Sequence, residues 1–251
     1  MRRYTTVLFD LFDTLIRLDR RRLPPVRIDG RDVRTSAAEI YPGVAALIPG
    51  VTLEAFYAAF LWSYEEAERR RAADHREIPA RERLGFCYAR LGLDPVRLPA
   101  ALSERLLAGH MACLARVAEP VPGQAALLDW LGGRYRLGIV SNFDYTPTVR
   151  RVLEEAGILD RFAAVVVSDA VGWRKPAAAI FRAAFERLGV SAPECLFVGD
   201  RPEIDVAGAK GVGMAAAWLN PEGTPFPPGL PVPDFTLAGL PALRRILEET
   251  A

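Results

Sequence analysis

The sequence contains little cysteine and histidine. Its three cysteines, Cys87, Cys113 and Cys195, are widely spaced, and only His75 and His110 could join them as metal ligands. An odd number of cysteines without a Cys-x-x-Cys pair argues against a disulfide framework and against a zinc site. We therefore expect free thiols in a reducing compartment.

Long apolar runs are also missing. No run approaches the roughly 18 residues that a membrane-spanning helix needs. The start of the chain is basic at Arg2 and Arg3, but Asp10 interrupts the apolar stretch that follows too early for a signal peptide. We expect a cytoplasmic protein with no membrane partner.

The chain has no excess of charge of one sign. Its 32 Lys and Arg residues nearly balance 31 Asp and Glu residues, which leaves a formal net charge of +1. A nucleic-acid partner usually shows as a strong basic excess, so none is expected. The length of 251 residues is enough for one large core or two modest ones.

The stretch from Thr5 to Phe9 is a run of β-branched and large apolar residues, which predicts a buried strand. It ends at Asp10. In an open parallel sheet the carboxyl ends of the strands border the crevice where ligands bind, so Asp10 is a candidate site residue. A turn or helix-cap role is the plainer interpretation of a single Asp at this position.

The remainder of the chain divides into two kinds of pattern. Residues 17–34 are rich in Arg and Asp and predict a loop or small hairpin, which is either solvated or a flap over Asp10 whose arginines meet an anionic substrate. From Ser36 to Val117 the apolar periodicity is helical almost throughout. From Glu119 onward, apolar strands and helices alternate, which predicts a mostly parallel sheet wrapped by helices.

This organisation predicts the α/β class, with a Rossmann-like doubly wound parallel sheet and an inserted all-helical subdomain. The core is expected to span residues 1–18 and 117–251, and the insertion residues 19–116. The later strands are predicted at Arg136–Val140, Ala163–Val167, Cys195–Val198 and Met214–Leu219. The helices before, between and after them are predicted at Gln124–Leu131, Pro147–Glu155, Ala177–Leu188, Ile204–Lys210 and Leu240–Glu248.

Polar residues follow several of these strands. Ser141 and Asn142 could hold the oxygens of an anion, although Ser-Asn is also an ordinary entry to a helix. Lys175 stands just before a helix begun by Pro176, so an ammonium and a helix N-terminus would point to one place.

Two further carboxylates complete the set. Asp200 ends a strand directly after Gly199, and Asp205 lies five residues later. Carboxylate oxygens together with water suit Mg²⁺.

Together these residues occur in the order and setting found in the haloacid dehalogenase-like hydrolases, which the sequence resembles over nearly its whole length. The matching segments are Asp10-Leu11-Phe12-Asp13-Thr14-Leu15, Val140-Ser141-Asn142, Val171-Gly172-Trp173-Arg174-Lys175-Pro176 and Val198-Gly199-Asp200 to Asp205-Val206-Ala207-Gly208-Ala209. The helical insertion between the first two segments corresponds to the cap of that superfamily.

The resemblance implies a role for each matching residue. Asp10 would be the nucleophile, forming a covalent aspartyl intermediate. Ser141 and Lys175, with Asn142 and Phe12, would bind the substrate. Lys175 would also shield the charges of Asp10 and the substrate from each other.

The resemblance also implies the metal ligands. Mg²⁺ would be held by Asp10, the backbone carbonyl of Phe12, Asp200 and Asp205. The substrate implied is a small anionic one, most simply a phosphorylated metabolite, which the cap would select.

Position 12 departs from the family pattern. Phosphatases of the superfamily usually carry there a second Asp that protonates the leaving alkoxide, whereas this chain has Phe12 followed by Asp13. General acid–base help is typically worth about 10²–10⁴-fold in rate. Adjacent residues on an extended chain point to opposite sides, so Asp13 cannot simply be assumed to replace the missing acid, and a carboxylate of the cap or flap is the other candidate for supplying the proton.

Three functions therefore stay open. The magnesium-type carboxylates favour a phosphatase, especially one acting on good leaving groups. Phe12 favours a metal-independent 2-haloacid dehalogenase, because members with that activity have an aromatic residue in this position and halide leaves without a proton. A catalytically weak protein that binds a phosphorylated ligand is the third possibility.

Overall fold

The structure, a computed structural model, describes residues 4–250. The chain forms two compact units. The first combines the residues up to Arg17 with those from Glu119 onward, and the second is Leu18–Ala118.

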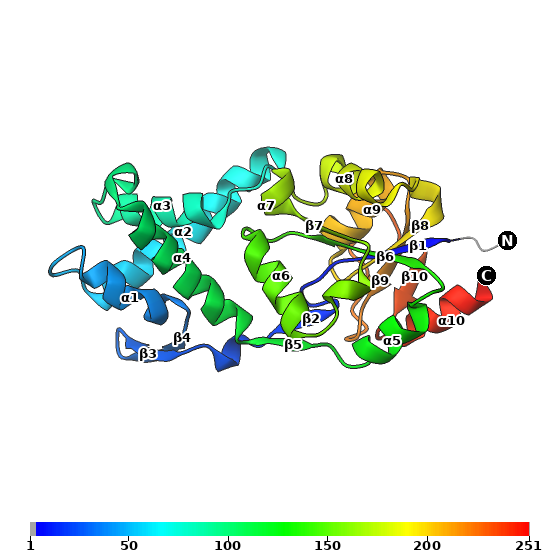
Figure 1. The fold of residues 1–251 in the computed structure, drawn as a ribbon, viewed down its shortest axis with the longest axis horizontal. Helices are drawn as coiled ribbons and strands as arrows, with labels where there is room; N and C mark the ends of the chain where they lie inside the picture. The colour runs from blue at the N-terminus through cyan, green and yellow to red at the C-terminus, as the bar shows by residue number, and fades with distance from the viewer. Residues whose placement is uncertain (1–3, 251) are drawn as a thin grey trace. The chain divides into compact units, whose positions relative to one another are not determined.

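The first unit contains a six-stranded sheet in the order β10-β9-β8-β1-β6-β7 (Figure 1). Its strands are β1 (Thr6–Phe9), β6 (Arg136–Ser141), β7 (Ala164–Val167), β8 (Cys195–Gly199), β9 (Ala215–Leu219) and β10 (Phe235–Leu237). All neighbouring strands are parallel. The prediction of an α/β fold with a parallel sheet is confirmed.

Helices cover both faces of this sheet, with α8 and α9 on one side and α5 and α10 on the other (Figure 1). The helices of this unit are α5 (Gln124–Leu131), α6 (Thr146–Glu155), α7 (Ser168–Val171), α8 (Ala178–Leu188), α9 (Ala207–Gly211) and α10 (Ala242–Glu249). Shorter turns are the 3-10 helices η3 (Leu159–Arg161) and η4 (Ala192–Glu194) and the π-helix η5 (Pro202–Val206). A sheet covered on both faces explains why every residue of β1 is buried.

The packing of α8 on the sheet depends on close approach. The ring of Phe181 on α8 meets Phe197 of β8 edge-on, with the ring centroids 5.4 Å apart. A Cβ atom at Gly138 of β6 would lie only 2.7 Å from Leu8 Cδ2 and 3.1 Å from Leu188 Cδ1. Glycine therefore lets two large side chains fill this part of the core.

The second unit is helical, apart from one hairpin. Its helices are α1 (Ala37–Ala45), α2 (Leu53–Asp74), α3 (Ala80–Arg90) and α4 (Ala100–Ala115), with 3-10 turns η1 (Arg20–Arg22) and η2 (Pro95–Arg97). The hairpin pairs β3 (Pro25–Ile28) with β4 (Arg31–Arg34), as the Arg-rich sequence predicts. Short strands β2 (Ile16–Leu18) and β5 (Ala118–Pro120) stand where the chain passes between the units.

His110 on α4 is fully buried within the helical unit. Its Nδ1 lies 3.0 Å from Ser36 Oγ, and its Nε2 lies 3.2 Å from Tyr64 OH and 3.0 Å from Arg83 Nη2. Since the arginine always donates, His110 Nε2 accepts and Nδ1 carries the proton.

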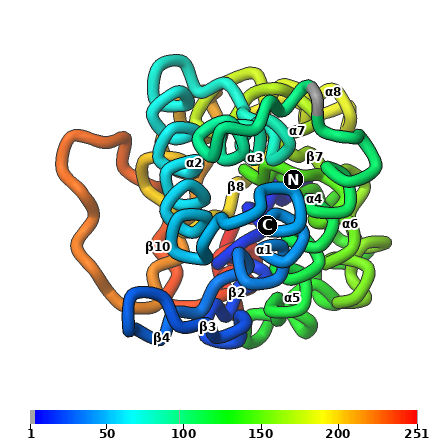
Figure 2. Tube along the Cα trace, turned by 90° about the vertical axis from the view of Figure 1, so that its left-hand side faces the viewer, coloured from blue at the N-terminus to red at the C-terminus, as the bar shows by residue number. Residues whose placement is uncertain are grey.

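The segment between β9 and β10 is a long loop without helix or strand, coloured orange in Figure 2. It is anchored at Phe226, whose ring meets Trp218 with a centroid separation of 5.1 Å. At its far end Asp234 pairs with Lys210 at 2.8 Å. Over residues 4–250, no helix has both the length and the apolar character needed to cross a membrane.

Candidate active site

The sheet register brings three of the predicted site residues to one edge. Phe9 of β1 is level with Ile139 of β6 on one side and with Val198 of β8 on the other. Because the strands are parallel, Asp10 follows β1 at the same edge where β6 ends in Ser141 and β8 leads into Asp200.

Lys175 reaches this edge from the segment between α7 and α8. Its Nζ lies 2.6 Å from Asp10 Oδ1 and 2.8 Å from Asp205 Oδ1. The Lys175 side chain is fully buried, and the side chains of Asp10 and Asp205 are 11% and 2% exposed. Lys175 thus joins two carboxylates that come from opposite ends of the sequence.

The main chain of Lys175 is fixed by Asn142. The Asn142 Oδ1 accepts from the Lys175 backbone N–H at 2.7 Å, and its Nδ2 donates to the Lys175 carbonyl at 3.0 Å. Asn142 is therefore a positioning residue for Lys175, while its direct contact with substrate stays a prediction.

Asp205 approaches the sheet through an unexpected turn. The sequence predicts a helix from Ile204, whereas the chain enters the π-helix η5 at Pro202 and continues into α9. Such turns are frequent at functional sites because they re-aim a side chain. Asp205 Oδ2 accepts from the Arg201 backbone N–H at 3.0 Å.

Gly199 makes room for this approach. A Cβ atom at Gly199 would lie 2.5 Å from both Cβ and Cγ of Asp205, which is closer than real contacts allow. The glycine before Asp200 is thus required by the position of Asp205. The carboxylates of Asp10, Asp200 and Asp205 then have ligand oxygens within 4.8 Å of one another.

Burial and mutual repulsion dominate the electrostatics of this cluster. Burial, opposed by Lys175 and reinforced by Asp205 and Asp200, raises the pKa of Asp10 to about 7. Burial and the Asp205 charge raise the pKa of Asp200 to about 6. Burial lowers the pKa of Lys175, but Asp10 and Asp205 outweigh it and the pKa is raised overall.

The donor set fits a hard divalent cation. Three carboxylates lie close together and a single ammonium contacts two of them, so the charge is not balanced without a further cation. Ser141 Oγ is also buried, and it has no hydrogen-bond partner among the described residues. An unpaired buried hydroxyl beside Asp10 suits an anionic ligand that accepts its hydrogen bond.

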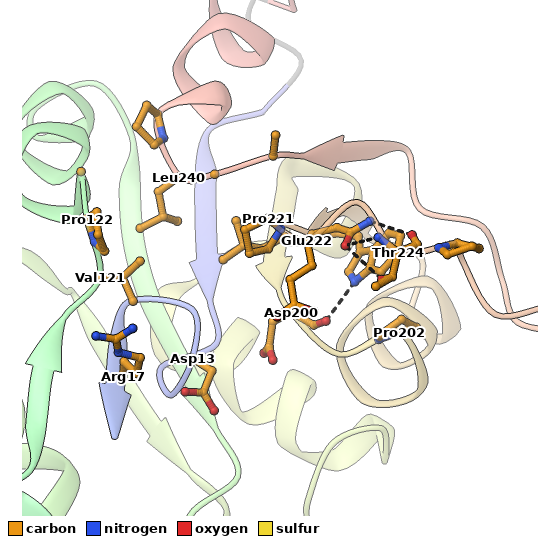
Figure 3. A pocket seen from close by; sticks show the side chains of 18 of the residues that line it. Asp13, Arg17, Val121, Pro122, Asp200, Pro202, Pro221, Glu222, Thr224 and Leu240 are labelled. Carbon is orange, nitrogen blue, oxygen red and sulfur yellow. Dashed lines mark hydrogen bonds between the residues drawn. The ribbon is translucent and has the colours of Figure 1, made fainter. Parts of the chain in front are cut away.

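Phe12 and Asp13 lie where β1 turns away. The ring of Phe12 packs on Phe143 with a centroid separation of 4.8 Å. Asp13 has a φ of 64°, in the left-handed region, so the treatment of this position as extended chain was wrong. The Asp13 carboxylate lies near enough to that of Asp200 to contribute to raising the Asp200 pKa, and both residues line the cavity shown in Figure 3.

A cavity of about 900 Å³ opens beside Asp13 and Asp200 (Figure 3). Sequence reasoning missed the residues that hold its inner wall. Trp218 Nε1 donates to the carbonyl of Asp200 at 2.9 Å, and Thr14 Oγ1 donates to Asp200 Oδ1 at 3.4 Å. The one available signal for Trp218 was its place near the end of the predicted strand Met214–Leu219.

The sequence and the fold are similar to those of known hydrolases. A family model described as haloacid dehalogenase-like hydrolase matches residues 4–213. The chain is 33% identical over 160 residues to the pyrimidine 5'-nucleotidase YjjG of Escherichia coli (strain K12), covering 63% of this chain and 66% of that protein. It is 37% identical over 136 residues to the glyceraldehyde 3-phosphate phosphatase of Pyrococcus abyssi, covering 54% and 56%. The alignments thus span about half to two thirds of these curated relatives.

A solved structure with the same fold is that of a 2-haloacid dehalogenase from Pseudomonas syringae pv. Tomato DC3000. It superposes with a TM-score of 0.74 at 25% identity, over 99% of this chain and 100% of that one. Both phosphatases and dehalogenases are therefore among the proteins that this chain resembles.

Proposed function

The chain belongs to the haloacid dehalogenase-like hydrolases, and on that premise we propose that it is a magnesium-dependent phosphatase acting on a small phosphorylated metabolite. The observation that carries the proposal is that Asp10, Asp200 and Asp205 lie close together while the one buried lysine at this edge contacts only two of them, Asp10 and Asp205. A site for a halide or a carboxylate alone needs no such excess of negative charge.

The ligands of the metal would be the carboxylates of Asp10, Asp200 and Asp205 and the backbone carbonyl of Phe12. When bound, Mg²⁺ would offset the charge of these carboxylates and polarise the phosphoryl group. The Gly199 position supports this assignment, because it allows Asp205 to stand against the sheet where its oxygens face the other two carboxylates.

The residues of the chain account for the group transfer. Asp10 is proposed to attack phosphorus as the bond to the leaving oxygen breaks, giving an aspartyl phosphate that water then hydrolyses. Ser141 would donate its free hydroxyl hydrogen to a phosphoryl oxygen. Lys175 would hold Asp10 ionised and bind the phosphoryl group, since its ammonium already lies 2.6 Å from Asp10 Oδ1.

The leaving group is where this enzyme is expected to differ from its relatives. Phe12 packs on Phe143 and offers no proton to a departing oxygen. We propose that aryl and acyl phosphates, whose leaving groups have low pKa values, react faster than alkyl phosphates. The helical unit, Leu18–Ala118, is proposed as the cap that selects among substrates.

A metal-independent 2-haloacid dehalogenase is the second candidate. The Phe12–Phe143 pair favours it, because an apolar wall beside the nucleophile suits a halide that leaves without a proton. The similarity to a solved dehalogenase agrees with this alternative. The three converging carboxylates argue for the phosphatase.

The test is a turnover screen of phosphate esters, acyl phosphates and 2-haloacids, each with Mg²⁺ and with a chelator. Asp10→Asn is expected to reduce turnover below a hundredth of the wild-type rate, because it removes the nucleophilic charge at the sheet edge. Asp160→Asn is a matched control, since Asp160 is an exposed residue of η3. Dehalogenation that persists in chelator, with no phosphate released from any ester, would overturn the phosphatase proposal.

A further inference from the structure

The cavity beside Asp200 is lined by both charged and apolar side chains. The charged ones are the carboxylates of Asp13, Asp200, Glu203 and Glu222 and one cation, Arg17. The apolar ones are mainly prolines, with Val121 and Leu240 among them, and several are labelled in Figure 3.

The single cation of the lining is already neutralised. Arg17 Nε donates to Glu119 Oε1 at 2.9 Å, and Arg17 Nη2 contacts the same oxygen. With that pair balanced, the cavity presents carboxylates to whatever enters it. An anionic group would be repelled there, while a cationic nitrogen would be attracted.

The wall that carries Glu222 is held in place before any ligand binds. Asn220 Oδ1 accepts from both the backbone N–H and the hydroxyl of Thr224 at 3.1 Å, and its Nδ2 donates to the Thr224 carbonyl at 2.9 Å (Figure 3). These bonds fix the turn around Glu222. A turn fixed in advance lets its side chain meet a cation without the entropic cost of ordering a loop.

The cavity also lies within reach of the proposed reaction. Asp200 belongs both to its lining and to the carboxylate cluster, where its ligand oxygen is within 4.8 Å of that of Asp10. A phosphate ester bound at Asp10 could therefore extend its alcohol past Asp200. All the lining residues belong to the unit that contains the sheet.

We propose that this cavity receives the non-phosphoryl end of the substrate and, alongside the selection proposed for the helical unit, favours a leaving group with a cationic nitrogen over one with a carboxylate. The inference rests on the proposed phosphatase function and adds a preference for a cationic end to its preference for leaving groups of low pKa. The apolar side chains of the lining would contact the carbon skeleton, and Glu222 and Glu203 would face the nitrogen.

The experiment uses three phosphate monoesters with the same two-carbon skeleton. These are O-phosphoethanolamine, 2-hydroxyethyl phosphate and phosphoglycolate, whose far ends are cationic, neutral and anionic. With Mg²⁺ present, the wild-type KM is expected to rise in that order. The Glu222→Lys variant should raise the KM of the amine and lower that of the carboxylate by about three- to fivefold each, the range expected for a partly exposed charge pair.

Two further variants isolate the effect. Glu186→Lys makes the same change in net charge at an exposed position of α8 outside the cavity, so it should leave all three KM values unchanged. Glu203→Lys reverses a second charge of the lining from another element and should act in the same direction as Glu222→Lys. Hydrolysis of all three esters with equal KM values, unaffected by either lining variant, would overturn the inference and leave the phosphatase intact.

Binding to Asp10→Asn, measured by calorimetry with the amine and carboxylate esters, separates the two proposals. Tighter binding of the amine, lost in the Glu222→Lys double variant, is the expected result. If that preference holds while the wild-type protein hydrolyses no phosphate ester, the phosphatase proposal fails and the charge preference of the cavity stands.

Discussion

Lys175→Met should destabilise the metal-free protein far more than an ordinary lysine substitution. The Lys175 ammonium is fully buried and lies within 2.8 Å of oxygens of Asp10 and Asp205. Removing one partner of a buried ion pair leaves an uncompensated charge and typically costs 3–5 kcal/mol. Methionine keeps most of the side-chain volume, so the loss is expected to come from charge rather than from a cavity.

Lys210→Met is the matched control. Lys210 also pairs with an aspartate at 2.8 Å, but the side chains of Lys210 and Asp234 are 29% and 26% exposed. Asp234 keeps a hydrogen bond from the Ala216 backbone N–H when the lysine is lost. A pair exposed to this degree is worth about 1 kcal/mol or less.

The dependence on pH gives the sharper test. Asp10 has a pKa of about 7 in the folded protein, above its ordinary value of 3.8, so the native state binds more protons than the unfolded state between these limits. The ionisation of this carboxyl therefore lowers stability as pH rises toward 7, and the loss of Lys175 should enlarge that effect. The defect of Lys175→Met is expected to be greatest at pH 8 and to shrink at pH 5.

Urea unfolding in chelator at pH 5 and pH 8 would measure the loss of stability in each variant. A defect of Lys175→Met that is no larger than that of Lys210→Met, or that stays the same at pH 5 and pH 8, would refute the reasoning. It would mean that water, rather than the ammonium, solvates the two carboxylates.

Three other predictions follow from the same cluster. Millimolar Mg²⁺ should raise the melting temperature by mass action, and Asp200→Ala should abolish this rise in a thermal melt. The rise should be larger at pH 8 than at pH 5.5, because protons compete with the metal for Asp200, whose pKa is about 6. Phe12→Asp should raise the rate on alkyl phosphates selectively, by up to about 10²-fold, whereas equal wild-type rates on alkyl and aryl phosphates would contradict a missing acid. Gly199→Ala should displace Asp205, lower the free energy of unfolding in urea by about 1–3 kcal/mol and weaken the Mg²⁺ response. Its control is Gly211→Ala, which has open space around the added methyl group and should be neutral or slightly stabilising.

The strand ends could be predicted from the sequence because each depends on a local pattern. The apolar run before Asp10 must be buried on both faces of the sheet, and the run before Asp200 has the same character. Parallel strands bring their carboxyl ends to one edge whatever their order, so the convergence of these residues did not require the topology to be known. The position of Lys175 also depends on a local pattern, because Pro176 directly after it marks the start of a new turn.

Contacts between distant segments could not be predicted in this way. The bonds from Asn142 to the main chain of Lys175 join residues 33 positions apart, and no periodicity signals them. The π-helix that carries Asp205 has no sequence signature that separates it from an ordinary helix start. The cavity wall from Asn220 to Thr224 is fixed by hydrogen bonds within a loop, which composition alone describes only as Pro-rich and extended.

Asp13 shows how one dihedral angle changes the chemical argument. On an extended chain its carboxylate would point away from the side that Phe12 occupies, and it would have no access to the substrate. With a φ of 64° the residue is not extended, and Asp13 lines the same cavity as Asp200. Phe12 packs on Phe143 and is not among the residues that line the cavity. Position 13 therefore places a carboxylate in the lining of the cavity, directly after an aromatic residue that packs on Phe143, and the proposed preference for a cationic end of the substrate depends on such acidic lining.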